Sequence, residues 1–155
     1  MAHSHGGNVV KVASQSIKHI IDNLVNLGTP QNVDLSLLGY STNTSAVKNY
    51  CNVYSYADPI QFAGASPLQI VLTGYFTYYG GYFAEQAALA FWQGDWYLGI
   101  YFSIYSKIYF DLANAFYLST KVDWVANNVE VSGSHTDLHT VGAWKDNNIR
   151  GRCGL

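Results

Sequence analysis

Charge, basic residues and cysteine are all scarce in this sequence, and each scarcity limits what the protein can be. Charged residues make up 12% of the 155 residues, about half of the roughly 25% that is usual in soluble domains. The net charge is −2 and the pI about 6.1, so the chain lacks the basic surface that binds nucleic-acid phosphates. A basic membrane-binding patch is excluded on the same ground. Any affinity for lipid would have to come from aromatic and apolar groups.

Cysteines and motifs of catalysis are equally sparse. Cys51 and Cys153 match no zinc or redox spacing. One long-range disulfide cannot be assigned from sequence, and two unrelated thiols, with Cys51 buried in a strand, are the favoured interpretation. No G-x-S-x-G, H-E-x-x-H, phosphate-loop or dinucleotide motif occurs. We therefore predict that the chain is not an enzyme and uses no cofactor.

The spacing of two histidines is the only pattern in the sequence that suggests a metal site. His135 and His139 stand at i and i+4 in GSHTDLH, but a site would need both on one helical face and a third ligand. A solvated loop is the favoured interpretation, and no metal site is predicted. The N-terminal MAHSHGG lacks the apolar region of a signal peptide, which leaves the compartment open between a secreted mature form and the cytoplasm.

Residues 9–27 show the clearest periodicity in the sequence. Apolar side chains recur at i, i+3 and i+4 along one stripe, and Gly28 and Pro30 follow it as helix-ending residues. We predict an amphipathic helix here, preceded by a flexible segment over 1–8. The stripe consists of Val10, Ala13, Ile17, Ile20, Ile21 and Leu24.

The remainder alternates apolar and polar residues and is rich in β-formers, which predicts strands. Gln93-Gly94-Asp95 fits a hairpin turn, and it interrupts the apolar run that a membrane-spanning helix of about twenty residues would need. A short helix around Asp111–Tyr117 is the alternative to a strand and loop over 108–122. The predicted fold is a mainly β, single-domain antiparallel β-sandwich over 1–155 with the helix packed on it. The predicted strands are 33–41, 47–57, 68–81, 84–92, 96–106, 127–133 and 140–144.

Aromatic residues are plentiful, at 15% of the chain, and they concentrate between Gly74 and Tyr117. As a strand, 96–106 would point Leu98, Ile100, Phe102 and Ile104 toward the core and Tyr97, Tyr101 and Tyr105 outward. Exposed tyrosine and tryptophan suit membrane interfaces, quaternary ammonium groups and sugars. The alternative is that a second layer of the protein covers this face.

The stretch AALAFWQGDWYLGIYFSIYSKIYFDLANAFY (87–117), together with the helix ending in LVNLG, resembles the actinoporin-like pore-forming cytolysins, whose wider set includes fungal fruit-body lectins. The resemblance implies a β-sandwich, a pocket for a phosphocholine head group and an N-terminal helix that detaches to line a pore. It matches Ser103 to a pocket serine, places Tyr109 and Phe110 in an aromatic loop, and sets Ser55 near a second pocket serine. Tyr105 stands where that family has a proline.

The sequence thus predicts a membrane-active protein that recognises lipid head groups through exposed aromatics and forms homo-oligomers. Whether the helix detaches to form a pore or stays packed is left open by its stripe, which serves both. A lectin-like module that binds glycans and a self-assembling structural protein are the alternatives. The predicted binding residues are Ser55, Tyr97, Tyr101, Ser103, Tyr105, Tyr109, Phe110 and Tyr117.

Overall fold

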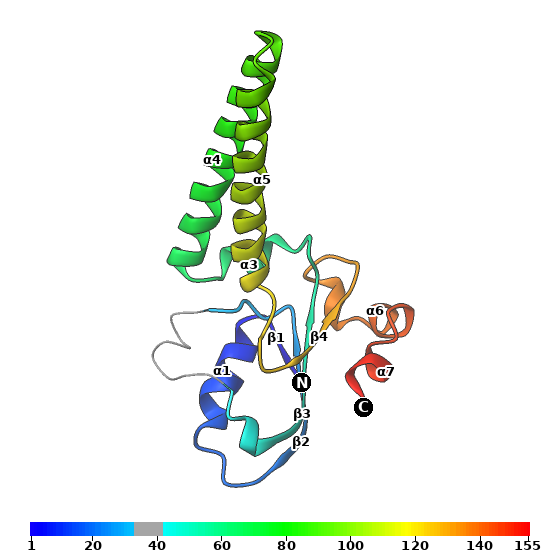
Figure 1. Ribbon diagram of the computed structural model, residues 1–155. Helices are drawn as coiled ribbons and strands as arrows, with labels where there is room; N and C mark the ends of the chain where they lie inside the picture. The colour runs from blue at the N-terminus through cyan, green and yellow to red at the C-terminus, as the bar shows by residue number, and fades with distance from the viewer. Residues whose placement is uncertain (33–41) are drawn as a thin grey trace. The chain divides into compact units, whose positions relative to one another are not determined.

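The computed structural model describes residues 1–32 and 42–155 and has an α/β fold. The chain divides into two compact units. Met1–Ser66 and Leu118–Leu155 form the first, called here the sheet unit, and Pro67–Tyr117 form the second, called the hairpin (Figure 1). The predicted strand over 33–41 lies outside the described residues. Whether the two units are one domain, as predicted for 1–155, stays a prediction.

The sheet unit is built on one four-stranded sheet in the order β1-β2-β3-β4, with every neighbouring pair parallel. The strands are β1 (Ala2–His3), β2 (Ile21–Leu27), β3 (Val47–Tyr54) and β4 (Asn127–Glu130). The predicted antiparallel β-sandwich is therefore wrong, since helix accounts for 56% of the described residues and strand for 14%. Parallel neighbours need crossover connections between them. In the described residues α1 lies between β1 and β2, and three helices lie between β3 and β4.

The predicted helix over 9–27 is replaced by two elements. Helix α1 (His5–Ser14) ends well before the apolar stripe does, and Ile21–Leu27 is strand β2. Strand β2 is exposed at the polar Asp22 and Asn23 and buried continuously from Leu24 to Leu27, so its apolar residues do not alternate and resemble part of a helical stripe when they are read alone. The segment 1–8, predicted to be flexible, contains β1 and the first turn of α1.

The proposed pore-lining residues are consequently scattered. Val10 and Ala13 lie in α1, Ile17 and Ile20 in the connection that follows, and Ile21 and Leu24 in β2. Leu24 is buried, whereas Ile20 is exposed. These six side chains do not form one stripe, so the structure removes the helix on which the pore prediction depended.

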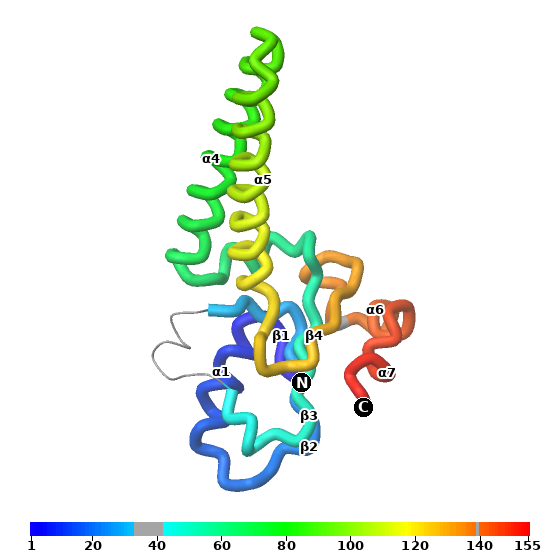
Figure 2. Tube along the Cα trace, in the orientation of Figure 1, coloured from blue at the N-terminus to red at the C-terminus, as the bar shows by residue number. Residues whose placement is uncertain are grey.

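One face of the sheet carries the apolar core of the unit. Val53, Leu138 and Ile149 have no exposed surface, and they pack with buried residues from β2, β4 and the C-terminal segment. That segment continues through the 3-10 turn Asp137–His139, α6 (Val141–Asp146) and α7 (Ile149–Cys153), a path that can be followed in Figure 2. The strand predicted over 140–144 is thus the start of a helix.

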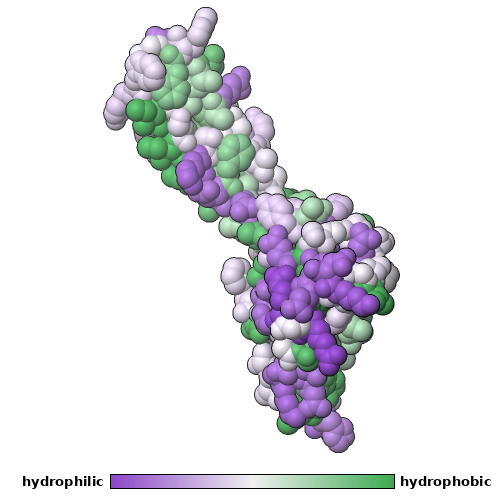
Figure 3. All heavy atoms as spheres, turned by 90° about the vertical axis from the view of Figure 1, so that its right-hand side faces the viewer, coloured by the Kyte–Doolittle hydropathy of each residue, from purple (hydrophilic) through white to green (hydrophobic). Residues whose placement is uncertain are grey.

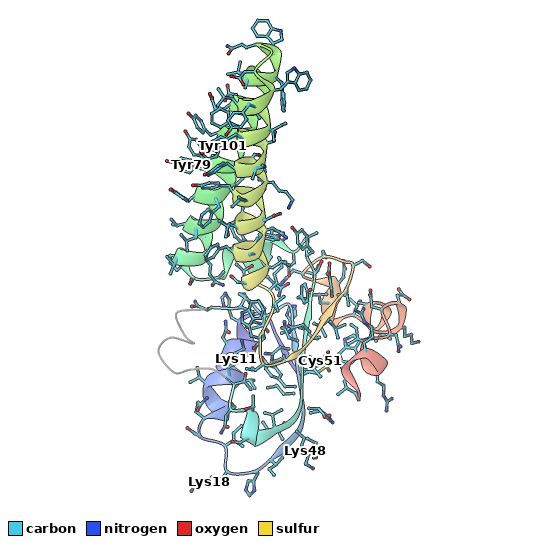
Figure 4. The ribbon with its side chains drawn as sticks, viewed as in Figure 1. Lys11, Lys18, Lys48, Cys51, Tyr79 and Tyr101 are labelled. Atoms are coloured by element: carbon cyan, nitrogen blue, oxygen red, sulfur yellow. A yellow bond between two sulfur atoms is a disulfide. The ribbon has the colours of Figure 1, made fainter. Side chains whose placement is uncertain are left out.

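A disulfide fastens α7 to the sheet. Cys51 of β3 and Cys153 are bonded across 102 residues, with Cα atoms 5.5 Å apart (Figure 4). The interpretation of two unrelated thiols is wrong, although Cys51 does lie buried in a strand, 1% exposed. The bond joins the strand that leads toward Asp58 to the segment that follows His135.

The hairpin consists of two long antiparallel helices, α4 (Pro67–Trp92) and α5 (Trp96–Ser119), joined at the predicted turn. The strands predicted over 68–81, 84–92 and 96–106 are wrong, and 108–122 is mostly helix, the alternative given for it. Aromatic and β-branched residues are favoured in strands, but tertiary context overrides that preference. Among the described residues, no helix combines the length and apolarity needed to cross a membrane.

Candidate functional site: the carboxyl ends of the parallel strands

Four strand ends of the sheet unit bring polar residues together. In a parallel sheet all carboxyl ends lie along one edge, and binding and catalytic groups of α/β proteins collect there. Ser4 follows β1, Gly28 follows β2, Asp58 follows β3 and His135 follows β4. The residues of this edge form the candidate site.

Ser4 occupies a strained turn between a strand and a helix. Its φ of 54° and ψ of −136° place it in a region that non-glycine residues rarely adopt and that clusters at functional sites. Its backbone is held in place, because its N–H donates to the Leu27 carbonyl at 2.9 Å and its carbonyl accepts from the Gly7 N–H at 3.0 Å. A serine at a helix N-cap usually caps with its hydroxyl, yet Ser4 makes no such bond. The hydroxyl is therefore not used by the helix.

Asp58 is a buried carboxylate with several fixed partners. It has no exposed surface, and its Oδ1 accepts hydrogen bonds from the backbone N–H groups of Ile60 and Gln61 at 2.8 and 3.4 Å. These bonds cap α3 (Pro59–Ala63), whose first residue is the proline that favours a helix start. The other oxygen, Oδ2, lies 2.7 Å from Nδ1 of His135. The cap thus aims the second oxygen at the histidine.

His135 is held by its neighbours on several sides. Its side chain is 12% exposed, its carbonyl lies 3.2 Å from Nε2 of His3, and the two imidazole centroids are 4.7 Å apart. Gly28 lets the ring approach the end of β2, since a Cβ there would lie 3.1 Å from Nδ1 of His135 and 2.9 Å from Cδ1 of Leu138. With Nδ1 on the Asp58 carboxylate, Nε2 is the nitrogen that remains for chemistry.

Ser4 and His135 each lie beside residues at the end of β2. The register pairs His3 with Leu27, so Ser4 comes next along the edge beside Gly28, against which the imidazole of His135 lies. The described residues include no hydrogen bond from the Ser4 hydroxyl to His135. Such bonds are commonly long in proteins without substrate. The edge therefore holds a serine, an imidazole and a buried carboxylate in sequence.

The start of α1 completes the surroundings of Ser4. The first N–H groups of a helix have no intrahelical partners and carry partial positive charge, and those of His5 and Gly6 come directly after the serine. Gly7 allows the helix to sit tightly on the end of β2, because a Cβ there would lie 2.0 Å from Oγ1 of Thr29. An anionic oxygen forming beside Ser4 would face these donors.

Sequence reasoning missed this site, although one signal was present. Ala2-His3-Ser4-His5-Gly6 differs from G-x-S-x-G only at its first residue, and Ala2 is itself buried in β1. The sequence pattern was interpreted only for His135 together with His139, either as a metal pair or, as the favoured interpretation, as part of a solvated loop. Instead it is largely buried and bonded to Asp58, a pairing across 77 residues. Within the described part of the chain, no group of three or more potential ligands could hold a metal.

The residues predicted to bind lipid do not belong to this edge as a group. Ser55 follows β3 in the sheet unit, where it is 2% exposed and its N–H donates to Oε1 of Gln61. The remaining predicted residues are all on the hairpin, in α5: Tyr97, Tyr101, Ser103, Tyr105, Tyr109, Phe110 and Tyr117. The structure therefore assigns Ser55 and the other seven to different units.

On α5 the tyrosines expected to face outward do so, but for a helical reason. Tyr97, Tyr101 and Tyr105 are spaced by four and share one helix face, with exposures of 80%, 44% and 37%. The rings of Tyr101 and Tyr105 lie 4.7 Å apart, and their hydrogen bond raises the pKa of Tyr101. The prediction that the alternate side chains face a core is wrong, because Leu98, Ile100 and Ile104 are exposed as well.

The comparisons add no relative to this description. No family model, no curated protein and no solved structure matches the chain, so the resemblance to the actinoporin-like proteins stays a prediction.

Proposed function

We propose that the chain is a serine hydrolase that cleaves carboxylic esters, with Ser4 as nucleophile, His135 as general base and Asp58 as the carboxylate that orients it. The observation that carries the proposal is the buried bond of 2.7 Å between Asp58 Oδ2 and His135 Nδ1 at the strand end next to the strained, non-capping Ser4. Serine, aspartate and histidine in this chain order, on a strand–turn–helix, are typical of α/β-hydrolases. The prediction that the chain is not an enzyme was made from motifs alone.

The reaction follows the logic of a serine–histidine–aspartate triad. Oγ of Ser4 bonds to the ester carbonyl carbon as its proton passes to Nε2 of His135. The carbon–oxygen bond to the alcohol then breaks, and the departing oxygen takes the proton from His135. Water attacks the acyl–serine, again giving its proton to His135, and the carboxylic acid leaves as Ser4 recovers its proton.

Two features of the site support the charge changes in this sequence. The Asp58 carboxylate stabilises the imidazolium that forms and holds the Nδ1–H tautomer, a role worth several orders of magnitude in such triads. In this proposal the His5 N–H, which follows the nucleophile at the start of α1, donates to the oxyanion of the tetrahedral intermediate.

A fluorophosphonate probe tests the proposal directly. Its reaction forms a bond from Oγ of the nucleophilic serine to phosphorus and releases fluoride, so peptide mass spectrometry identifies the labelled residue. We expect label on Ser4, its loss in Ser4→Ala, and a loss of at least about 100-fold in labelling rate in His135→Gln. Ser45→Ala and His19→Gln, two exposed positions elsewhere in the sheet unit, are matched controls that should label normally. Label spread over other serines, or an unlabelled Ser4, would overturn the proposal.

The hairpin favours a second function, which retains the lipid binding predicted from sequence. We infer that it contacts a lipid–water interface through its tip, where Trp92, Trp96 and Tyr97 are 86%, 69% and 80% exposed. Tryptophan and tyrosine prefer such interfaces. Figure 3 shows mostly green and pale residues over the hairpin and few purple ones, so little charge would have to be desolvated. A phosphocholine head group, a glycan or a second copy of the chain remain competing occupants.

Vesicle sedimentation separates these occupants. We expect binding to phosphatidylcholine vesicles that drops about tenfold or more in Trp92→Ala/Trp96→Ala, since two large aromatic groups are removed. Trp124→Ala is the matched control, because Trp124 is 83% exposed but lies in the sheet unit. Binding that is absent or unchanged in the tip variant would contradict the proposal. Binding to a glycan array would favour the lectin alternative, and a stable lipid-free oligomer with protected tip tryptophans would favour self-association.

A further inference from the structure

Lys121 is the least expected buried residue of the sheet unit. Its side chain has no exposed surface, although lysine is almost never fully buried unless it is paired. It follows α5, where the chain returns to the sheet unit. Its Nζ donates a hydrogen bond of 2.5 Å to the backbone carbonyl of Asp58. A full positive charge is thus buried against the residue that carries the candidate triad carboxylate.

The backbone around Lys121 is anchored independently of its side chain. Its carbonyl accepts from Nδ2 of Asn52 in β3 at 2.7 Å, and the carbonyl of Thr120 accepts from the N–H of Gln31 at 2.7 Å. Both elements of this anchorage, β3 and the segment after β2, also lead into the candidate site. The backbone of Lys121 is therefore held in place by hydrogen bonds, and its ammonium extends from this position to Asp58.

We propose that Lys121 is a positioning residue of the candidate hydrolase site: its ammonium fixes the backbone of Asp58, and through the Asp58 carboxylate the orientation of His135 toward Ser4. This inference rests on the proposed function. The Asp58 carboxylate links Lys121 to the histidine. Its Oδ1 accepts a hydrogen bond from the start of α3, and its Oδ2 contacts His135. A shift of the Asp58 backbone would move both oxygens together.

Charge adds to the mechanical effect. The ammonium places a positive charge against the residue whose carboxylate contacts the imidazole. Burial lowers the pKa of Lys121 to about 8, an effect that the Asp58 charge partly opposes. Among the described residues, the titratable groups around this segment include Asp123, which is paired with Lys11 at 2.7 Å, and Asp58 with its partner His135. The positioning charge should therefore be lost as the pH rises through about 8.

Lys121→Met tests the proposal, because methionine keeps most of the side-chain volume and removes the donor and the charge. We expect fluorophosphonate labelling of Ser4 to slow by about 10- to 100-fold, the loss that a misplacement of about 1 Å produces. In the wild-type protein the labelling rate should also fall above pH 8, and Lys121→Met should lose that limb. Lys121→Arg, which keeps the charge, should retain more of the rate. Lys107→Met, at an exposed lysine of the hairpin, is the matched control.

A second readout separates this inference from the proposed function. The proton shared by His135 Nδ1 and Asp58 should give a far-downfield ¹H NMR signal, assigned by its absence in His135→Gln. Lys121→Met should shift or broaden it with the far-UV circular dichroism unchanged. If the wild-type protein shows the signal but Ser4 is not labelled, the proposed hydrolase function is refuted. The effect of Lys121→Met on the His135–Asp58 pair can still be measured from the signal. An unchanged signal and an unchanged labelling rate in Lys121→Met overturn the inference, and so does Lys121→Arg if it folds and behaves as Lys121→Met does. If Lys121→Met fails to fold, the inference is decided by the labelling rate of the wild type above pH 8 and by the labelling rate of Lys121→Arg.

Discussion

The sheet unit and the hairpin bury their residues in opposite ways. In the sheet unit the buried side chains are branched and interlocked, with Val53, Leu138 and Ile149 fully covered. In the hairpin the buried positions along the helix–helix seam are small, including Gly80, Ala87, Gly99, Ser106 and Ala113. Large rings there pack beside the seam, as Phe76 and Phe116 do at 5.5 Å, or project outward.

This difference indicates which contacts stabilise each unit. Small residues let two helix backbones approach closely, and the Ser106 hydroxyl bonds across the seam to the Gly80 carbonyl at 2.9 Å. Figure 4 shows Tyr79 of α4 and Tyr101 of α5 on the same side of the hairpin. The hairpin is thus held by a narrow seam, whereas the sheet unit has a core of its own that can hold polar groups rigidly. Paired substitutions in the two units test this difference.

The disulfide should have the largest effect, and only on the sheet unit. Replacing Cys51 and Cys153 by alanine removes a cross-link over 102 residues, for which the chain-entropy model expects a loss of about 4–5 kcal/mol in unfolding free energy. Urea unfolding followed by near-ultraviolet circular dichroism measures it, while the helical signal of the hairpin should persist. Equal loss of hairpin helicity would show that the two units unfold as one.

Two ion pairs allow the same substitution in both units. Lys11–Asp123 is buried, with side chains 9% and 10% exposed, whereas Lys107–Asp111 is 76% and 65% exposed. Asp123→Asn should cost about 3–5 kcal/mol, because it leaves a buried ammonium uncompensated. Asp111→Asn should cost about 0.5 kcal/mol or less. Denaturant titration of both variants measures the difference, and similar costs would contradict the contrast.

Leucine truncation compares the two kinds of packing. Leu138→Ala, at a fully buried position of the apolar core, should cost about 3 kcal/mol through lost contacts and a cavity. Leu89→Ala, in α4 at 44% exposure, should cost well under half as much. Thermal unfolding of the pair is the measurement. Leu138 also packs near His135, so its truncation should slow the labelling of Ser4, and Leu89→Ala should leave that rate unchanged.

The smallest effect concerns pH and the two kinds of lysine. Because the folded-state pKa of Lys121 is lowered from 10.5 to about 8, the unfolded chain binds more protons between these values, and stability rises with pH across that window. Between pH 8 and 9.5 we expect a gain of about 1.5 kcal/mol in the wild type relative to Lys121→Met. Lys107→Met, which removes an exposed lysine, should follow the wild type. A Lys121→Met profile parallel to the wild type would contradict the burial of its charge.

Local patterns predicted some elements and misread others for identifiable reasons. The strand over 47–57 is confirmed as β3, and the turn at Gln93-Gly94-Asp95 is where the chain reverses. The segment 68–106 is helical because paired helices bury a seam of small residues, a feature that aromatic propensity does not report. Residues 21–27 were assigned to a helix because β2 is exposed at Asp22 and Asn23 and buried throughout Leu24–Leu27, which leaves no period of two in its apolar residues.

The candidate site could not be assembled from sequence because its parts are distant. Ser4, Asp58 and His135 reach the same end of the sheet only through its parallel register, which no local pattern specifies. Ala2 obscured the serine motif, since a strict pattern demands glycine there. The burial of Asp58 and Lys121 was equally hidden, because both are residue types that normally lie at the surface.

The parallel register also sets the order in which the protein acquires its structure. Contacts within the hairpin join helices that are adjacent in the chain, and such local contacts form in microseconds to milliseconds. The contacts of the sheet are remote, as the bond between His3 and His135 shows with its separation of 132 residues, and closing long loops slows folding. In a newly made chain the aromatic hairpin would therefore fold before the residues of the proposed triad come together, and the C-terminal segment bearing His135 would be the last part to pack on the sheet.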